Sequence, residues 1–251
     1  MKKIIEIAEL EKVSTPFGVI IGNFDGVHLG HQNLIKNFLS ACAVQNLVPY
    51  IITFSPHPNE FFNPELEDYI LTSFDDKNEL LESFGVENIA LIKFTKKVQS
   101  LNATEFLNKF LLNCSQLKYI HLGHDFKLGK GKVDARDLIK DLVVGKQVQL
   151  NFEPSFMIDN IAVSSSLVRN ELAKDISLSN KYLGRHYSIS GEIVTGKGIG
   201  KKKLFPTANL ACDEKIKKPG LGVYISKLTV GDKEYESVTN IGINPTISEG
   251  N

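Results

Sequence analysis

The first region of the chain that could carry out chemistry contains two histidines. The sequence reads Gly22-Asn-Phe-Asp-Gly-Val-His28-Leu-Gly-His31, directly after the apolar run Val19–Ile21 and before a stretch with helical spacing. Glycines allow tight turns there, and a helix start supplies free N–H groups and a partial positive charge that favour phosphate. Two imidazoles on one side of this helix start can donate hydrogen bonds to a triphosphate. The motif predicts a nucleotide-phosphate site at a strand-to-helix turn.

A second region of this kind is Ser164-Ser165-Ser166, which precedes Leu-Val-Arg169. Serine hydroxyls cap helix starts, and the Arg169 guanidinium can meet two phosphate oxygens at once. Taken alone, each region has a simpler interpretation: turn glycines with surface histidines, or a capped helix with a solvent-exposed arginine. A zinc site would need a third ligand, which the spacing of Cys and acidic residues does not supply. Together, the two helix starts predict one triphosphate held from opposite sides.

The elements that would position these residues follow an α/β pattern over residues 1–183. Short apolar runs alternate with amphipathic stretches, which is typical of a doubly wound parallel sheet. The predicted strands are Val19–Ile21, Tyr50–Phe54, Ile89–Ile92, Tyr119–Leu122 and Val148–Phe152. After Leu183-Gly184 the pattern changes to short strands with Gly-rich and Lys-rich turns. These strands are Tyr187–Ile193, Ala208–Leu210, Gly222–Leu228 and Ser237–Ile241, and they predict a small antiparallel β-barrel domain over residues 184–251 that is incomplete.

Composition excludes several classes of protein. The chain of 251 residues has 29 Lys+Arg and 29 Asp+Glu, so net charge gives no reason to bind nucleic acid or an anionic membrane. Its apolar runs are too short to span a bilayer, and its 3 Cys are too widely spaced for a disulfide framework or a Cys-based zinc site. We expect a cytoplasmic protein that acts on small molecules, and the sequence makes no prediction of oligomeric state.

The ordered motifs resemble a known family. Gly22–His31 is similar to the G-x-F-D-G-x-H-x-G-H signature of the bacterial bifunctional riboflavin kinase/FAD synthetases, and Thr53–Pro58 is similar to that family's T-F-x-P-H-P segment. Further segments follow in the family's order: Leu71–Ser73, Leu122–Phe126, Val163–Arg169, Leu183–Arg185, Phe205–Asn209, Pro219–Tyr224 and Asn240–Thr246. The resemblance covers nearly the whole chain.

For residues 1–183 the resemblance implies an FMN adenylyltransferase, in which the FMN phosphate attacks the α-phosphorus of ATP and gives FAD and pyrophosphate. It implies that Mg²⁺ bridges the phosphates, and that positioning and charge neutralisation carry the rate. The expected catalytic residues are His28, His31, Ser165, Ser166 and Arg169. The expected binding residues are Gly22, Phe24, Asp25, Gly26, Gly30, Pro56, His57, Pro58, Asp125, Phe126 and Ser164, and Phe61 and Phe62 are further candidates for a flavin pocket.

For residues 184–251 the resemblance implies a riboflavin kinase module. Thr207 and Asn209 would lie near Mg²⁺ and the ATP phosphates. The composition of Gly196–Lys203, which includes Gly198 and Gly200, is compatible with a phosphate-covering loop and also with a solvated turn. The chain departs from the family pattern because Lys201, Lys203 and Leu204 replace the Arg, Leu and Gly that usually precede F-P-T-A-N. The family's kinase base is a Glu beyond the end of this sequence, so we expect residues 1–251 to phosphorylate riboflavin poorly.

Two alternatives remain open at this stage. The His and Ser-Arg motifs indicate ATP rather than FMN, so the chain is also compatible with an adenylyltransferase for another phosphorylated acceptor. A non-catalytic flavin-binding protein is the second alternative, although such a protein has little need of a triphosphate site.

Overall fold

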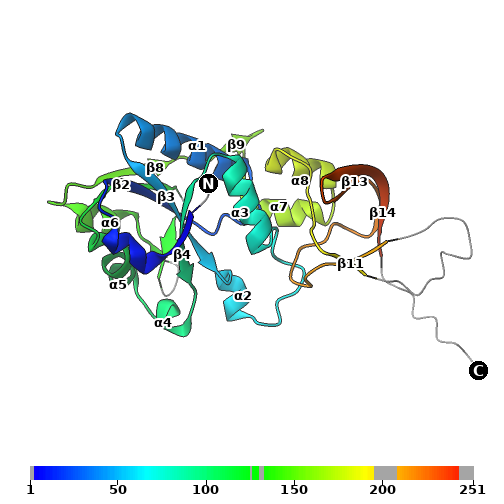
Figure 1. Ribbon diagram of the computed structural model, residues 1–251, viewed down its shortest axis with the longest axis horizontal. Helices are drawn as coiled ribbons and strands as arrows, with labels where there is room; N and C mark the ends of the chain where they lie inside the picture. Colours follow the sequence, from blue (N-terminus) through cyan, green and yellow to red (C-terminus); the bar gives the residue numbers. More distant parts are fainter. Residues whose placement is uncertain (1–2, 125, 130–132, 195–207, 243–251) are drawn as a thin grey trace, which may run out of the picture.

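A six-stranded parallel sheet forms the centre of the N-terminal part of the chain. The computed structural model describes residues 3–124, 126–129, 133–194 and 208–242. The sheet has the strand order β1-β4-β3-β2-β5-β8, and every neighbouring pair in it is parallel (Figure 1). Its strands are β1 (Lys3–Glu6), β2 (Phe17–Ile21), β3 (Val48–Ser55), β4 (Asn88–Lys93), β5 (Leu117–Gly123) and β8 (Gln149–Glu153).

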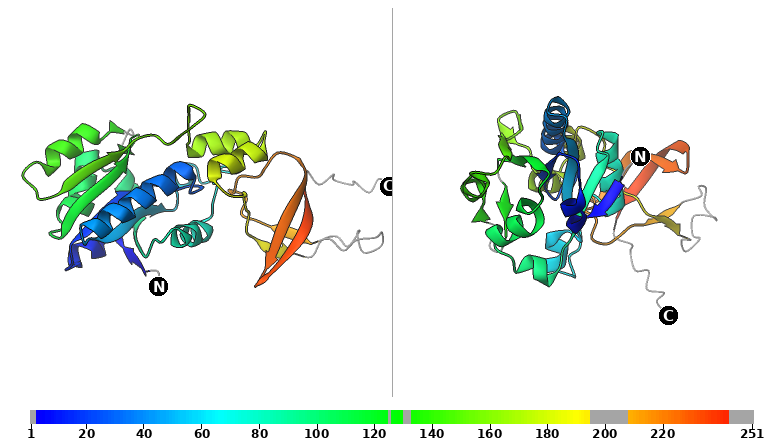
Figure 2. Two further views of the ribbon diagram at one scale, coloured as in Figure 1. Left: turned by 90° about the horizontal axis from the view of Figure 1, so that it is seen from above. Right: turned by 60° about the vertical axis from the view of Figure 1, so that its left-hand side comes forward.

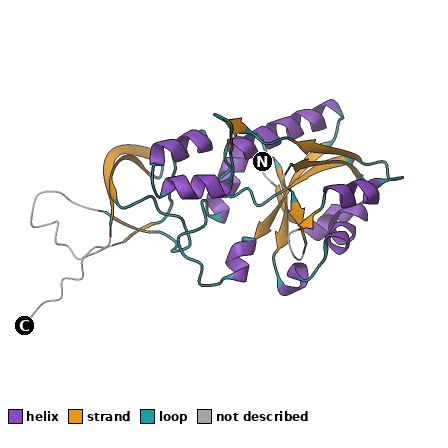
Figure 3. Cartoon of the chain, turned by 180° about the vertical axis from the view of Figure 1, so that it is seen from behind, coloured by secondary structure: helices purple, strands orange, loops and turns teal. Residues whose placement is uncertain are grey.

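Helices cover both faces of the sheet, because successive strand residues point to opposite sides. Ile20 and Ile51 pack with α1 (Leu29–Val44) and α3 (Phe74–Ser83) in one buried cluster. The neighbouring residues Ile21 and Ile52 pack on the other face. That face is covered by η1 (Ile7–Lys12), α5 (Ala103–Leu107), η2 (Asn108–Leu112) and α6 (Arg136–Val143). The result is the three-layered arrangement that Figure 3 shows, with helices on both sides of the sheet.

The strand β2 lies between β3 and β5, so the strand order reverses there. The chain leaves β2 through α1 on one face, whereas the connection from β4 to β5 runs over the other face. In open α/β sheets this reversal leaves a crevice at the carboxyl ends of the strands, where ligands bind. The Gly22–His28 loop therefore occupies the position that the fold reserves for a ligand.

Short helices and hairpins follow the carboxyl ends of the strands. The helix α2 (Pro58–Phe62) follows β3, α4 (Lys96–Gln99) follows β4, and the strand pairs β6 (Lys127–Leu128) with β7 (Val133–Asp134) and β9 (Met157–Ile158) with β10 (Ile161–Ala162) form hairpins. The helices α7 (Ser165–Leu172) and α8 (Ile176–Leu183) bury Leu71, Val168 and Leu183 in a core of their own. They lie between the parallel sheet and the C-terminal strands (Figures 1 and 2).

The C-terminal strands form two antiparallel pairs. One is β11 (Glu192–Val194) with β12 (Asn209–Ala211), and the other is β13 (Gly222–Val230) with β14 (Lys233–Ile241). The fold-class prediction of a parallel α/β domain followed by an antiparallel β module is confirmed. Within the described ranges these pairs are separate two-stranded sheets rather than a closed barrel.

One strand prediction is wrong in its bounds. The strand expected over Tyr187–Ile193 begins only at Glu192. The backbone N–H of Tyr187 donates to Asn180 Oδ1, and its hydroxyl donates to the Lys217 carbonyl. These bonds anchor Tyr187 in a loop against α8 instead of a sheet. As the sequence indicated, no helix in the described part of the chain has the length and apolar character to cross a bilayer.

Candidate functional site

The loop after β2 places the two histidines at the first turn of α1, as the sequence predicts. His28 is the N-cap residue, and its Nδ1 accepts a hydrogen bond of 3.3 Å from the His31 backbone N–H. The two rings are stacked, with centroids 3.7 Å apart and an interplanar angle of 19°. A Cβ at Gly30 would lie 3.1 Å from His28 Cε1, so glycine leaves the room that this ring needs.

The backbone of this loop is unusual in its conformation. Phe24 and Val27 have φ values of 50° and 38°, in the left-handed region that side-chain-bearing residues rarely adopt. Gly26, between them, has a φ of 80°, and a Cβ there would lie 2.7 Å from Leu71 Cδ1. Its N–H donates to Thr72 Oγ1 at 3.1 Å. Left-handed residues persist where surrounding contacts hold them, and they concentrate at functional sites.

Both histidines are neutral at pH 7. Burial is the main cause that lowers the pKa of His28 to about 3, with further contributions from the charges of Arg169 and Arg185. The pKa of His31 is also lowered well below its usual range, first by burial and then by His28, Lys77 and Arg169. Because His28 Nδ1 is an acceptor, its single proton belongs on Nε2. That N–H group can donate a hydrogen bond to a phosphate oxygen.

Arg169 lies beside this loop as one half of a buried ion pair. Its Nη2 is 2.6 Å from Asp25 Oδ2, and its Nε donates to the Tyr69 carbonyl at 2.8 Å. The guanidinium carbon lies 4.0 Å from the centroid of the Tyr69 ring, a cation–π distance. Asp25 Oδ1 also accepts from the backbone N–H groups of Leu71 and Thr72. The structure thus brings two predicted site residues, Asp25 and Arg169, into direct contact.

The predicted second helix start lies against the same loop. Ser164 is the N-cap of α7 and accepts from the Leu167 N–H at 3.2 Å. Ser165 Oγ donates to the Asp25 carbonyl at 2.8 Å, and Ser166 is exposed. The starts of α1 and α7 therefore meet across Asp25.

Lys77 is a further candidate site residue, one that sequence reasoning missed. It lies on α3 with 5% of its surface exposed, and its Nζ is 3.3 Å from both the Asn23 carbonyl and Thr53 Oγ1. Burial is the main cause that lowers its pKa to about 8, and the charge of Asp25 opposes that effect. The one available signal is its position four residues before Leu81, on the buried face of the helix.

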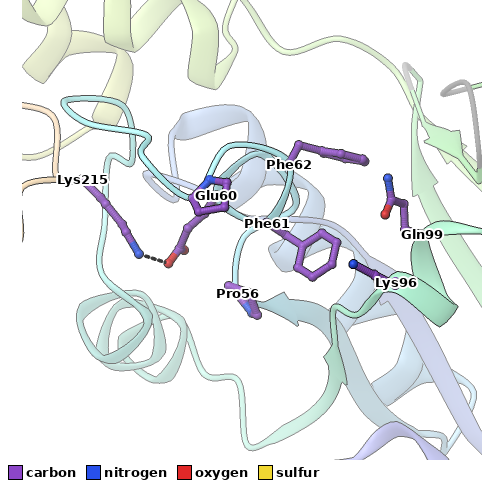
Figure 4. Close-up of a pocket in the computed structure, with 8 residues that line it drawn as sticks. Pro56, Glu60, Phe61, Phe62, Lys96, Gln99 and Lys215 are labelled. Atoms are coloured by element: carbon purple, nitrogen blue, oxygen red, sulfur yellow. Dashed lines mark hydrogen bonds and ion pairs between the residues drawn. The ribbon is translucent and has the colours of Figure 1, made fainter.

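A cavity adjoins this loop at Asp25, and a second cavity lies next to the first. The smaller, of about 190 Å³, is lined by Asp25, Phe54, Ser55, Pro56, His57, Glu60, Ile70, Thr72, Ser73, Phe74, Lys77, Asp213, Lys215 and Ile216. The larger, of about 530 Å³, is lined by Pro56, Glu60, Phe61, Phe62, Pro64, Lys96, Gln99 and Lys215 (Figure 4). The two predicted aromatic candidates for a flavin pocket, Phe61 and Phe62, therefore line one cavity.

The other predicted binding residues have varied positions. Pro56 lines both cavities, and Pro58 is the first residue of α2. His57 is the N-cap of α2, and mainly burial lowers its pKa to about 4. Phe24 is fully buried, and its ring forms a T-shaped pair with His31, with the centroids 5.2 Å apart. The Gly22 N–H donates to the Ile52 carbonyl. Phe126 packs against the sheet core, and Asn209 is exposed on β12. Asp125, Gly198, Gly200 and Thr207 lie outside the described residues.

Arg185, just after α8, also holds the histidine loop. Its Nη2 donates to the Gly26 carbonyl at 2.7 Å, and its Nη1 donates to the Val27 carbonyl at 3.2 Å. Gln32 Nε2 bridges the Val27 and Leu183 carbonyls at 2.8 and 2.7 Å. The loop is thereby fixed from the junction between the two halves of the chain.

Comparison with known proteins identifies the family. Residues 10–167 match the family model described as FAD synthetase, and residues 183–251 match that described as riboflavin kinase. A bifunctional riboflavin kinase/FMN adenylyltransferase from Buchnera aphidicola subsp. Schizaphis graminum is 35% identical over 98% of this chain and 80% of its own length. The enzyme of the same name from Escherichia coli K12 is 31% identical over 91% of this chain and 73% of its own length.

A solved structure has the same fold. It is described as a macrolide-efflux protein from Streptococcus pneumoniae, and it aligns with a TM-score of 0.84 and 26% identity over 97% of this chain and 80% of that one. The sequence motifs, the two matched family models and the relatives from Buchnera aphidicola and Escherichia coli agree. The chain belongs to the bifunctional riboflavin kinase/FMN adenylyltransferase family.

Proposed function

We propose that residues 1–183 form a domain that transfers AMP from ATP to FMN, giving FAD and pyrophosphate. The observation that carries the proposal is the stacked pair of neutral histidines at the start of α1, which faces the start of α7 across Asp25. Residues 184–251 would form the second, riboflavin kinase domain of the family. Family membership and the site geometry support this assignment.

The reaction needs no protein nucleophile. An oxygen of the FMN phosphate forms a bond to the α-phosphorus of ATP, the bond from that phosphorus to the bridging α–β oxygen breaks, and pyrophosphate leaves. Negative charge increases on the leaving group, so donors aimed at it stabilise the transition state. We assign this donor role to the Nε2–H group of His28 and to His31. Ser165, Ser166 and Arg169 would orient the triphosphate from the start of α7.

Lys77 completes the charge arrangement. Its ammonium lines the smaller cavity between β2 and β3, and its charge reaches both His31 and His57. A buried ammonium without a directly bonded carboxylate can interact with an incoming anion more strongly than a surface lysine can. We assign it to the acceptor phosphate as this phosphate approaches the ATP.

The two cavities fit the two ends of FMN. A flat tricyclic ring needs apolar walls, which Pro56, Phe61, Phe62 and Pro64 give the larger cavity. The smaller cavity has donors for a phosphate in Ser55, Thr72 and Lys77, and two of its carboxylates, Asp25 and Glu60, are paired with Arg169 and Lys215. FMN would place its ring in the larger cavity and its phosphate in the smaller one.

Mg²⁺ is expected to accompany ATP and to neutralise phosphate charge. In the described ranges, no group of three or more His, Cys, Asp or Glu side chains could hold a metal ion by itself. Asp25 is already bonded to Arg169, Leu71 and Thr72. These residues are therefore compatible with a Mg²⁺ ion that is held mainly by substrate phosphates and water, as Mg²⁺ commonly is. In the second domain Asn209 is a candidate ligand, together with Thr207.

Incubating the protein with ATP, Mg²⁺ and either FMN or riboflavin, followed by chromatographic separation of the flavins, tests the proposal. Conversion of FMN to FAD supports it. Consumption of ATP with another phosphorylated acceptor, but not with FMN, would favour the broader adenylyltransferase alternative. Flavin binding without any product would favour the non-catalytic alternative. Formation of FMN from riboflavin in the second reaction would assign kinase activity to the domain that matches the riboflavin kinase model.

A further inference from the structure

A segment from the second half of the chain forms one wall of the proposed FMN site. This docked segment, Asp213–Lys218, lies within the region that matches the riboflavin kinase model. The Lys215 carbonyl accepts from the N–H groups of Tyr69 and Ile70 at 2.9 and 2.8 Å, and the Lys217 N–H donates back to the Ile70 carbonyl at 2.8 Å. Ile216 is buried with 6% exposure beside Ile70. The backbone on both sides of Lys215 is thus fixed to the first domain.

The Lys215 side chain turns toward both cavities. Its Nζ is 2.6 Å from Glu60 Oε1, and the two side chains keep 33% and 25% of their surface exposed. Figure 4 marks this ion pair with a dashed line. Lys215, Glu60 and Pro56 are the three residues that line both the larger and the smaller cavity. The ion pair therefore marks the junction between the two cavities.

The proposed function fixes which part of FMN would cross this junction. The ring occupies the larger cavity and the phosphate occupies the smaller one, so the ribityl chain with its three hydroxyl groups must lie between them. Each hydroxyl both donates and accepts hydrogen bonds. Lys215 has two further N–H groups besides the one directed at Glu60, and the Glu60 carboxylate has further lone pairs. A donor next to an acceptor is the arrangement that a chain of hydroxyl groups requires.

We propose that Lys215, together with Glu60, binds the ribityl hydroxyls of FMN, so that a residue of the second domain determines acceptor specificity in the first. The proposal rests on the proposed adenylyl transfer and adds to it the part of the acceptor that is recognised. A flavin phosphate whose side chain carries hydroxyl groups is therefore selected over one whose side chain lacks them. The pair acts on substrate binding, so it affects KM for the acceptor more than kcat.

The test compares FMN with an analogue in which hydrogens replace the ribityl hydroxyls, and it measures dinucleotide formation from each. The full chain, Lys215→Met and Lys217→Met are assayed together. Lys217 is a matched control, because it lies on the same docked segment and forms an ion pair with Asp68 but lines neither cavity. The ratio of the two KM values removes effects of a substitution on the folded state that are common to both acceptors.

We expect the KM of the unsubstituted chain to be about tenfold higher for the analogue than for FMN, since hydrogen bonds to charged groups are lost. In Lys215→Met this ratio should fall to about threefold or less, through a higher KM for FMN, whereas Lys217→Met should keep the original ratio. An unchanged ratio in Lys215→Met, or an equal fall in Lys217→Met, would overturn the role of Lys215. Absence of any FAD from the unsubstituted chain would instead overturn the proposed function itself.

Discussion

Arg169 and Asp25, which are 144 residues apart in the sequence, meet in a buried ion pair with 2.6 Å between Nη2 and Oδ2. Their side chains are 10% and 4% exposed. The pair connects the loop after β2 to the helix α7, and Tyr69 fixes the guanidinium from a third segment. The two halves of the proposed ATP site are therefore held in register by charges that also belong to that site.

Substitution of one partner should cost considerable stability. Asp25→Asn leaves the Arg169 charge buried without a counter-charge, which typically destabilises a protein by about 3 kcal/mol or more. Urea denaturation measures this loss in the free energy of unfolding. Asp134→Asn is the control, because its partner Arg136 is 45% exposed and such pairs contribute about 1 kcal/mol or less. Equal losses in both variants would contradict the account of the buried pair.

His28 should make the protein sensitive to acid. Its pKa is about 3 in the folded protein and 6.5 in an unfolded chain, so below about pH 6.5 only the unfolded state binds the proton. The stability that depends on a neutral His28 is fully present above about pH 6.5, and it is lost as the pH falls toward about 3. His28→Asn keeps an N-cap acceptor but cannot titrate. In His28→Asn the free energy of unfolding should fall less steeply with decreasing pH than in the unsubstituted chain. Between about pH 6 and 4.5 the two slopes should differ by about 1.4 kcal/mol per pH unit.

Denaturation of both proteins across this range provides the measurement. A comparison at about pH 8 gives the effect of the side-chain exchange itself, which is subtracted at each lower pH. Parallel stability curves for the two proteins would contradict the buried, neutral state of His28.

The lowered pKa of Lys77 predicts that kcat/KM changes with pH on the alkaline side of neutrality. Its pKa of about 8 means that the ammonium is charged below this pH and neutral above it. The value of kcat/KM for FMN reports ionisations of the free enzyme, so it should fall as the pH rises through about 8. Lys77→Met should have a lower kcat/KM without this fall. Lys77→Arg should keep its charge throughout the range, because arginine does not titrate there. A fall of the same size in Lys77→Met would assign the titration to another group.

The sequence predicted the parts of the site that local chemistry determines. Glycines, a buried strand before them and helical spacing after them define the turn that carries His28 and His31. The three serines define the start of α7. These features depend on neighbours within a few residues, so composition and spacing are sufficient to reveal them.

Contacts between distant segments could not be predicted in the same way. Asp25 and Arg169 are both predicted site residues, but their pairing depends on how α7 lies against the loop after β2. Lys77 has the spacing of an ordinary helical lysine, and only the packing of α3 shows that it is buried. Lys215 reaches Glu60 from 155 residues away. The strand β1 was missed because it is a four-residue edge strand in which only Ile5 is buried.

The rate of FAD formation in His31→Ala tests most directly whether the histidine loop carries out adenylyl transfer. The measurement uses saturating ATP, Mg²⁺ and FMN, with unfolding followed in parallel to show that the variant is folded. Loss of a donor aimed at the transition state costs about 3 kcal/mol, so kcat should fall about a hundredfold. The exposed His186 serves as the control, and His186→Ala should form FAD at the rate of the unsubstituted chain. A folded His31→Ala protein that turns over at the unsubstituted rate would contradict the assignment of this loop as the site of transfer.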